Sequence, residues 1–260
     1  MAQDDPFGTA RARRGADDAL EPLASQVISV LCERQTSTPA GARQVVVDYL
    51  LRAVISPAGF DAALVMEELR GYRLTIDAII DLYIPQVANH MGELWMTSDV
   101  DFASVTVGAL RLQALLSEAS AALPQTSSYA QDAPLALVVV SEREQHFLGA
   151  SVVAAQLRRL GCEVSLSIAE APKQIINRVV YDQPDMVLMS CAQVNGLETI
   201  AQSVKKIRRA TDPVPVLALG GAVRGDFDGI RKKTGVDLVT KSAKDVVGFY
   251  TKRRKALSRG

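Results

Sequence analysis

Cysteine is scarce in this sequence, which has only Cys32, Cys162 and Cys191 among its 260 residues. The three are far apart in the chain, and no two of them form a C-x-x-C pair. The sequence therefore predicts neither a disulfide framework nor a zinc site. Their apolar surroundings indicate buried thiols in a protein of a reducing compartment.

Long apolar segments are also missing. No uninterrupted apolar run approaches the ~18 residues that a membrane-spanning helix requires. The N-terminal sequence MAQDDPFGTARARRGADD has no apolar core of the kind that a secretory signal contains. We therefore expect a cytoplasmic protein.

A net charge is absent too, because 29 Lys and Arg residues balance 29 Asp and Glu residues. The composition therefore gives no reason to expect general attraction to nucleic acid or to acidic lipid. The tail 252–260, KRRKALSRG, is an exception with five basic residues and no acidic one. It is either a solvated chain end or a weak contact for nucleic acid or a partner.

The first half of the chain has helical periodicity. Residues 1–20 are polar and aperiodic, which predicts a disordered tail. Residues 21–123 are predicted to form a helical bundle, because apolar residues recur at alternating spacings of three and four. Two stripes show this spacing: Phe102, Val105, Ala109, Leu112 and Leu116, and before them Ile76, Ile80, Tyr83, Val87, Met91 and Leu94.

Several residues in this half predict where helices begin or change direction. Thr75 is a candidate N-cap with Asp77 in the first turn. Pro85 interrupts the same helix and should kink it. Ser-Pro at 56–57 and Thr-Pro at 38–39 are typical of helix starts with proline in the first turn.

After a linker at 124–134, short apolar, β-branched segments alternate with helical ones. This alternation predicts an α/β domain over residues 135–254, with a flavodoxin-like five-stranded parallel sheet, followed by a basic tail at 255–260. Such sheets bind ligands at the carboxyl ends of their strands. The predicted strands are 135–140, 162–168, 185–190, 214–220 and 236–240, and the predicted helices are 148–160, 172–182, 196–209, 223–233 and 242–254.

Familiar site motifs are absent from these strand ends. The turn after the first strand reads SEREQHF and lacks G-x-G-x-x-G, and the chain has neither a P-loop nor a G-x-S-x-G elbow. A phosphate-receiving response regulator requires an aspartate at the end of the third strand, where this sequence has Ser190. Dinucleotide, nucleotide, hydrolase and phosphoreceiver functions are therefore not expected.

The same turn contains His146, flanked by Glu144 and Gly149. A lone histidine in a loop is commonly structural or simply exposed. This one follows a strand at the ligand-binding edge, and Gly149 permits close approach of a ligand. Glu144 could accept a hydrogen bond from the imidazole nitrogen that a metal leaves free, as carboxylates beside metal-bound histidines do.

Two other strand ends add small residues. Ser190 closes the third predicted strand, and Gly220 and Gly221 close the fourth. With Gly149, they suggest a slot that admits a long ligand between the sheet and its helices.

In order and spacing, these residues resemble the cobalamin-binding domain family, whose motifs are Asp-x-His-x-x-Gly, Ser-x-Leu and Gly-Gly. Forty residues separate Gly149 from Ser190, and twenty-seven separate Ala192 from Gly220, as the family pattern requires. This sequence departs from the pattern at Glu144, where the family has Asp, and at Ala192, where it has Leu.

The resemblance implies a role for each matching residue. His146 would replace dimethylbenzimidazole as the lower axial ligand of cobalt, with Glu144 as its partner. Ser190 would extend the hydrogen-bond chain that tunes the His–cobalt bond. Gly149, Gly220 and Gly221 would line the slot for the nucleotide tail.

The helical half fits the same resemblance. In cobalamin-binding photoreceptors and methyl carriers, a bundle with a G-x-L-W sequence covers the upper face of the corrin. Here GELW ends in Trp95, the only tryptophan; the alternative is an ordinary core tryptophan. Val105 and Thr106 stand where photoreceptor relatives carry Glu-His. His90 is expected to be a surface or core histidine, with an upper-face contact as the alternative.

No residues remain for a second catalytic module, so we expect a carrier or sensor and not an enzyme. No helix-turn-helix segment precedes the bundle, so a sensor would bind DNA only indirectly or weakly.

Over about residues 60–250 the chain most resembles the AerR/PpaA group of purple bacteria. That resemblance implies a cobalamin-binding, light-responsive antirepressor whose partner is a CrtJ/PpsR-type repressor of photosynthesis genes. A corrinoid methyl carrier and a haem-binding redox sensor, with His146 on iron, remain alternatives.

Overall fold

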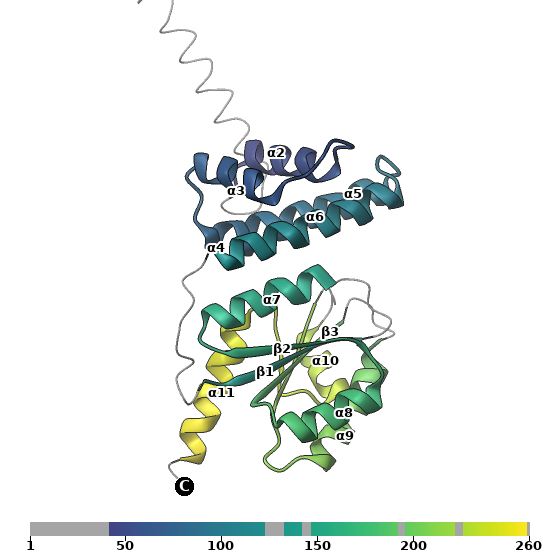
Figure 1. Ribbon diagram of the computed structural model, residues 1–260. Coiled ribbons are helices and arrows are strands. Elements are labelled where there is room, and N and C mark those ends of the chain that lie inside the picture. Colours follow the sequence, from purple (N-terminus) through teal and green to yellow (C-terminus); the bar gives the residue numbers. More distant parts are fainter. Residues whose placement is uncertain (1–41, 123–132, 142–146, 192–195, 222–225, 259–260) are drawn as a thin grey trace, which may run out of the picture.

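The computed structural model describes residues 42–122, 133–141, 147–191, 196–221 and 226–258. Within these ranges a helical unit is stacked on an α/β unit (Figure 1). The predicted disordered tail, the Thr-Pro pair at 38–39 and nearly all of the predicted linker lie outside the described residues.

The helical unit confirms the predicted bundle over its described part. The apolar faces of its helices meet in one core, in which Leu50, Leu69, Ile80 and Leu112 are fully buried. Burial of each such side chain stabilises the fold by about 1.5–3 kcal/mol. The elements are α2 (Gln44–Ile55), α3 (Ala62–Gly71), α4 (Ile76–Ala78), the π-helical turn η1 (Ile79–Tyr83), α5 (Ile84–Met96) and α6 (Phe102–Ala121).

Thr75 caps α4 as predicted, since its hydroxyl accepts a hydrogen bond from the Ala78 amide at 3.1 Å. We expected Pro85 to kink the following helix, and the structure shows η1 immediately before it. In this turn the Ile84 amide donates to the Ile79 carbonyl, the i to i+5 pattern of a π-helix. A proline has no amide hydrogen to donate, so a helix must adjust its hydrogen bonding near Pro85.

The prediction that Ser56-Pro57 starts a helix is wrong. Ser56 is the C-cap of α2, and α3 begins only at Ala62, after the N-cap Asp61. Proline commonly follows a helix end, because it cannot continue the helix. The chain is held here by Arg111 of α6, which donates to the Val54 carbonyl at 2.9 Å and the Ala58 carbonyl at 3.0 Å.

The predicted stripe on α6 is wrong at its N-terminal end. The side chain of Phe102 is 64% exposed and does not enter the core. The buried face of α6 is instead made by Gly108, Leu112, Leu115, Leu116 and Ala119. The first turn of α6 lies beside the aromatic end of α5, where Phe102 contacts Trp95.

The α/β unit confirms the predicted parallel sheet. Its strands are β1 (Leu135–Ser141), β2 (Glu163–Glu170), β3 (Met186–Ser190), β4 (Val216–Gly220) and β5 (Leu238–Val239). All pairs are parallel, and their order is β2-β1-β3-β4-β5, which is the flavodoxin-like order. The strand order reverses between β1 and β3, so a ligand crevice is expected at their carboxyl ends.

Helices cover both faces of this sheet (Figure 1). On one face α8 (Pro172–Asp182), α9 (Leu197–Ala210) and α10 (Phe227–Thr234) bury apolar residues against the strands. On the other face α7 (Phe147–Arg159) and α11 (Ala243–Leu257) do the same. Helix α11 continues into the predicted basic tail as far as Leu257, since nothing in KRRKAL breaks a helix.

The helical unit rests on α7, which therefore has apolar contacts on two sides. Val152 and Ala155 of α7 belong to the core of the bundle, and Leu148 packs at its margin. Ala150 and Leu157 of the same helix belong to the core beneath, between α7 and the sheet. This shared helix fixes the bundle above the α/β unit.

Candidate functional site

The central strands of the sheet bring Ser190 and Gly220 side by side at their carboxyl ends. These two residues are direct partners in the pairing of β3 with β4. The pairing continues one residue further, because the Cys191 amide donates to the Gly220 carbonyl at 3.0 Å. The structure therefore joins two of the predicted strand ends at one edge.

Gly221 is pressed against the end of β3. Its φ is +100°, and a Cβ atom there would lie 2.6 Å from the Cys191 carbonyl oxygen and 3.0 Å from Ser190 Oγ. A Cβ atom on Gly220 would lie 3.2 Å from the Thr240 carbonyl oxygen. The chain's own backbone thus requires glycine at 221, and the result is a strand edge without projecting side chains.

Gly149 differs from this pair. It lies in the first turn of α7, is exposed, and has no atom within 4 Å of the position that a Cβ would occupy. Nothing in the described fold demands glycine there, so the space in front of this turn is open to a ligand. Phe147, at the start of the same helix, is 40% exposed.

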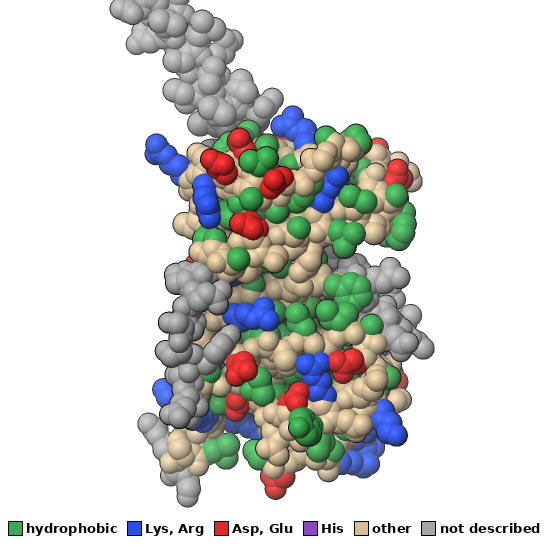
Figure 2. Space-filling view, in the orientation of Figure 1, with side chains coloured by type: hydrophobic (Ala, Val, Ile, Leu, Met, Phe, Trp, Pro, Cys, Tyr) green, Lys and Arg blue, Asp and Glu red, His purple; other side chains and the backbone are tan. Residues whose placement is uncertain are grey.

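Trp95 is not a core tryptophan. Its side chain is 51% exposed, and its ring lies 6.3 Å from that of Phe102, with the two planes inclined by 56°. Met96 beside it is 80% exposed. Apolar side chains gather at this end of the bundle, where α5 passes into α6 (Figure 2). The α5–α6 end and the start of α7 lie on the side of the molecule toward which the strands point (Figure 1).

The remaining candidates are placed in part. Glu144, His146 and Ala192 lie outside the described residues. His90 is half-buried on α5. Within the described ranges, no three His, Cys, Asp or Glu side chains converge to hold a metal ion.

Two of the cysteines are buried, as expected, and Cys32 lies outside the described residues. Burial raises the pKa of the Cys162 thiol from 9.0 to about 11, and the nearby charge of Asp185 adds to the effect. Cys162 therefore stays protonated at neutral pH, which makes it a poor nucleophile and a poor metal ligand.

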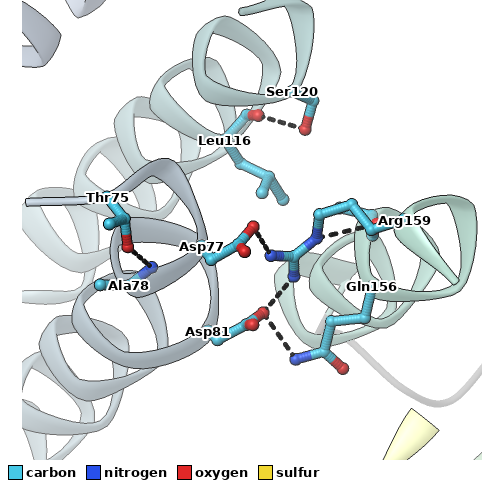
Figure 3. A network of polar contacts seen from close by, with 9 residues as sticks. Thr75, Asp77, Ala78, Asp81, Leu116, Ser120, Gln156 and Arg159 are labelled. Carbon is cyan, nitrogen blue, oxygen red and sulfur yellow. Dashed lines mark hydrogen bonds and ion pairs between the residues drawn. The ribbon is translucent and has the colours of Figure 1, made fainter. Parts of the chain in front are cut away.

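A polar clamp holds the bundle to α7 (Figure 3). Arg159 pairs with both Asp77 and Asp81, and Gln156 Nε2 donates to Asp81 Oδ1 at 3.0 Å. The Arg159 side chain is only 17% exposed, whereas that of Asp77 is 66% exposed. The clamp fixes the bundle at the opposite end of α7 from Gly149.

Sequence reasoning missed this clamp. In the sequence, Asp77 in a first turn and Arg159 in a last turn are each explained by the helix dipole. Arg159 is separated in the sequence from Asp77 by 82 positions and from Asp81 by 78. No local pattern indicates such a contact.

The α/β unit matches a known family of domains. Residues 134–247 match the B12-binding domain family. This part of the chain is a B12-binding domain. The match begins just before β1 and ends within α11, so it covers the whole sheet and all of the described strand ends.

Two similar proteins extend the likeness beyond this domain. An uncharacterised 20.5 kDa protein from the bchF-crtJ intergenic region of Rhodobacter capsulatus is 28% identical over 188 residues, which cover 72% of this chain and 98% of that protein. The monomethylamine corrinoid protein of Methanosarcina barkeri has the same fold, with a TM-score of 0.63 and 13% identity over 80% of this chain and 98% of that chain. No helix in the described ranges is long and apolar enough to cross a membrane.

The described residues fit a corrinoid. The strand edge at Gly220 and Gly221 carries no bulky side chain, and the first turn of α7 leaves open space at Gly149. The exposed Trp95 and Phe102 offer an apolar surface suited to the face of a macrocycle. The elements that carry them, the carboxyl ends of the strands, the start of α7 and the α5–α6 end, lie on one side of the molecule (Figure 1).

Proposed function

We propose that this protein binds cobalamin and regulates transcription as a light-responsive antirepressor, without catalysing a reaction. Its partner is a repressor of the CrtJ/PpsR type. The observation that carries the proposal is a B12-binding domain joined to a bundle in a chain that matches 98% of a relative from the bchF-crtJ intergenic region. The name of that region includes crtJ, which is also the name of the repressor type that the resemblance implies.

Each site residue has a proposed part in holding the cofactor. His146 would bind the cobalt, and Glu144 would accept the hydrogen bond from its other ring nitrogen. Ser190 continues that hydrogen-bond chain at the end of β3, and Gly149, Gly220 and Gly221 leave room for the nucleotide tail. Trp95 and Phe102 exclude water above the ring. When bound, cobalamin would supply a cobalt centre at which a ligand can be exchanged.

A regulator needs two states that a signal can interconvert. Among the described helices of the B12-binding domain, α7 is the one with extensive contacts to the bundle, where it packs against α6 and η1. A change above the corrin can therefore act through α7. Light is the proposed signal, and the hydroxo and adenosyl forms are both candidates for the bound cofactor.

The first experiment tests cofactor binding. The full chain is mixed with hydroxocobalamin and, separately, with haemin, then desalted, and absorption spectra are recorded in the dark and after illumination. We expect retained corrin with a shifted spectrum, and quenching of the fluorescence of Trp95. His146→Ala should weaken binding by at least the 10–100-fold typical of lost support around a metal ligand.

His90→Ala is the matched control, since it removes the other histidine of the chain and should leave the spectrum unchanged. A protein that retains haem but no corrin contradicts the proposal and supports the haem sensor. Retention of corrin by His146→Ala contradicts the proposed axial ligand.

The second experiment tests the regulatory role. Binding of a CrtJ/PpsR-type repressor to its operator is measured with cofactor-loaded protein, with apo protein and with the loaded His146→Ala variant. We expect only the loaded native protein to weaken operator binding. Methyl transfer from the methylated protein to an acceptor enzyme, without any effect on the repressor, supports the methyl carrier instead.

A further inference from the structure

Three helices of the α/β unit end in clusters of basic residues. Residues 197–258 contain 14 Lys and Arg residues against six Asp and Glu residues. Because the whole chain has 29 of each, this net charge of +8 is balanced by −8 elsewhere in the chain. The clusters are Lys205, Lys206, Arg208 and Arg209 on α9, Arg231, Lys232 and Lys233 on α10, and Lys252, Arg253, Arg254 and Lys255 on α11.

The fold brings these clusters to one end of the sheet. In a parallel α/β sheet the helices run opposite to the strands, so their C-terminal turns meet at the amino ends of the strands. Asp237, just before β5, shows the convergence directly. Arg208 Nη2 lies 2.6 Å from its carboxylate and Arg253 Nη1 lies 3.9 Å from it, although α9 and α11 cover opposite faces.

Folding accounts for only some of this charge. Arg208 and Arg253 pair with Asp237 and also donate to the carbonyls of Gly235 and Val214. A cation in the last turn also stabilises the helix dipole. The six lysines of these clusters, however, are all exposed and have no described carboxylate within 4.0 Å: Lys205, Lys206, Lys232, Lys233, Lys252 and Lys255.

We propose that these six lysines, the lysine surface, bind the phosphate backbone of duplex nucleic acid. Like charges held together cost free energy, which a polyanion recovers by neutralising them and releasing its counterions. Because backbone contacts position a protein without reading bases, we expect binding that is independent of sequence.

The composition of the lysine surface separates this partner from two others. Protein interfaces depend on buried aromatic and apolar anchors, and single strands are bound by stacking on aromatic rings. On the C-terminal turns of α9, α10 and α11, Leu257 is the one large exposed apolar side chain among the described residues. Interfaces with duplex nucleic acid are polar and strongly positive, as this surface is.

The lysine surface lies at the opposite end of the strands from Ser190 and Gly220. A duplex bound there leaves the carboxyl edge and the Trp95 end of the bundle free for other contacts. The apo protein carries the same charges, so duplex binding requires neither the proposed cofactor nor the proposed regulatory role.

The test measures binding of the apo full-length chain to a fluorescent random-sequence DNA duplex by anisotropy at several salt concentrations. RNA duplex, single-stranded DNA and polyglutamate are the comparison probes. The variants are Lys232→Gln/Lys233→Gln and Lys252→Gln/Lys255→Gln. The control is Arg70→Gln/Lys173→Gln, which removes two exposed charges elsewhere.

We expect each double variant to bind DNA about tenfold more weakly at low salt and to lower the salt slope by about 2, since each phosphate contact contributes ~0.9. The control should change neither quantity. Equal affinity for DNA and RNA duplexes supports backbone recognition, and preference for either identifies the source of the phosphates. Absence of duplex binding at low salt, equal loss in the control, or tighter binding to polyglutamate or to the single strand overturns the proposal.

Discussion

Gly221 and Gly149 show at the scale of single residues that two glycines of one predicted site can have different physical reasons. The φ of +100° at Gly221 and the close approach of the Cys191 backbone make glycine necessary for the fold itself. Gly149 has free space on its exposed side. Packing therefore accounts for the glycine at position 221. At position 149 packing does not require glycine, and close approach of a ligand is the proposed reason.

Gly221→Ala should destabilise the protein by about 2 kcal/mol or more, because an alanine there would adopt a strained backbone conformation and collide with the end of β3. The measurement is urea unfolding of the apo protein followed by circular dichroism. Gly248→Ala is the control: Gly248 lies within α11, has open space around it, and should gain about 0.5–1 kcal/mol as alanine. An unchanged midpoint for Gly221→Ala would show that the strand ends can separate without cost.

At the scale of elements, α7 joins the candidate ligand site to the clamp that holds the bundle. Its first turn contains Gly149, its apolar flank enters the core of the bundle, and its last turn contributes Arg159 to the clamp. One helix thus holds the ligand edge and the bundle in a fixed relation.

Asp77→Asn/Asp81→Asn should loosen the bundle on α7. Exposed ion pairs contribute little, so we expect a loss of about 1 kcal/mol that diminishes at high salt. Urea unfolding gives the stability, and amide hydrogen exchange over residues 76–83 shows where the structure opens. Asp228→Asn breaks the 3.4 Å pair with Arg231 and serves as the control, for which no change is expected. A loss of equal size in that control would remove any special role of the clamp.

At the scale of the whole molecule, the bundle completes the α/β unit. Val152 and Ala155 are only 6% and 4% exposed, and the bundle is what covers them. Without it, the outer side of α7 would present these residues and Leu148 to water.

A fragment of residues 133–260 should therefore bind a hydrophobic dye such as ANS and unfold at a lower urea concentration than the full chain. The uncovering of Val152 alone removes about 1.5–3 kcal/mol of burial. Val152→Ser in the fragment should reduce dye binding, which assigns the signal to α7. A fragment that binds no dye and is as stable as the full chain would show that the bundle contributes nothing to the α/β unit.

The sequence by itself determined the elements and their class. Strand and helix boundaries in the second half follow from local periodicity, and the parallel sheet follows from their alternation, so both were predicted closely. The order of Glu144, His146, Gly149, Ser190, Gly220 and Gly221 by itself resembles the pattern of a B12-binding domain.

Tertiary structure decided the features that depend on residues distant in the chain. Ser56-Pro57 follows the end of a helix, where Arg111 donates to the carbonyls of Val54 and Ala58. Phe102 lies outside the core, beside the exposed Trp95. The clamp through Arg159 and the meeting of α9 and α11 at Asp237 join segments that no local pattern links. Periodicity reports which face of an element is apolar, whereas only the packed chain shows what each face meets.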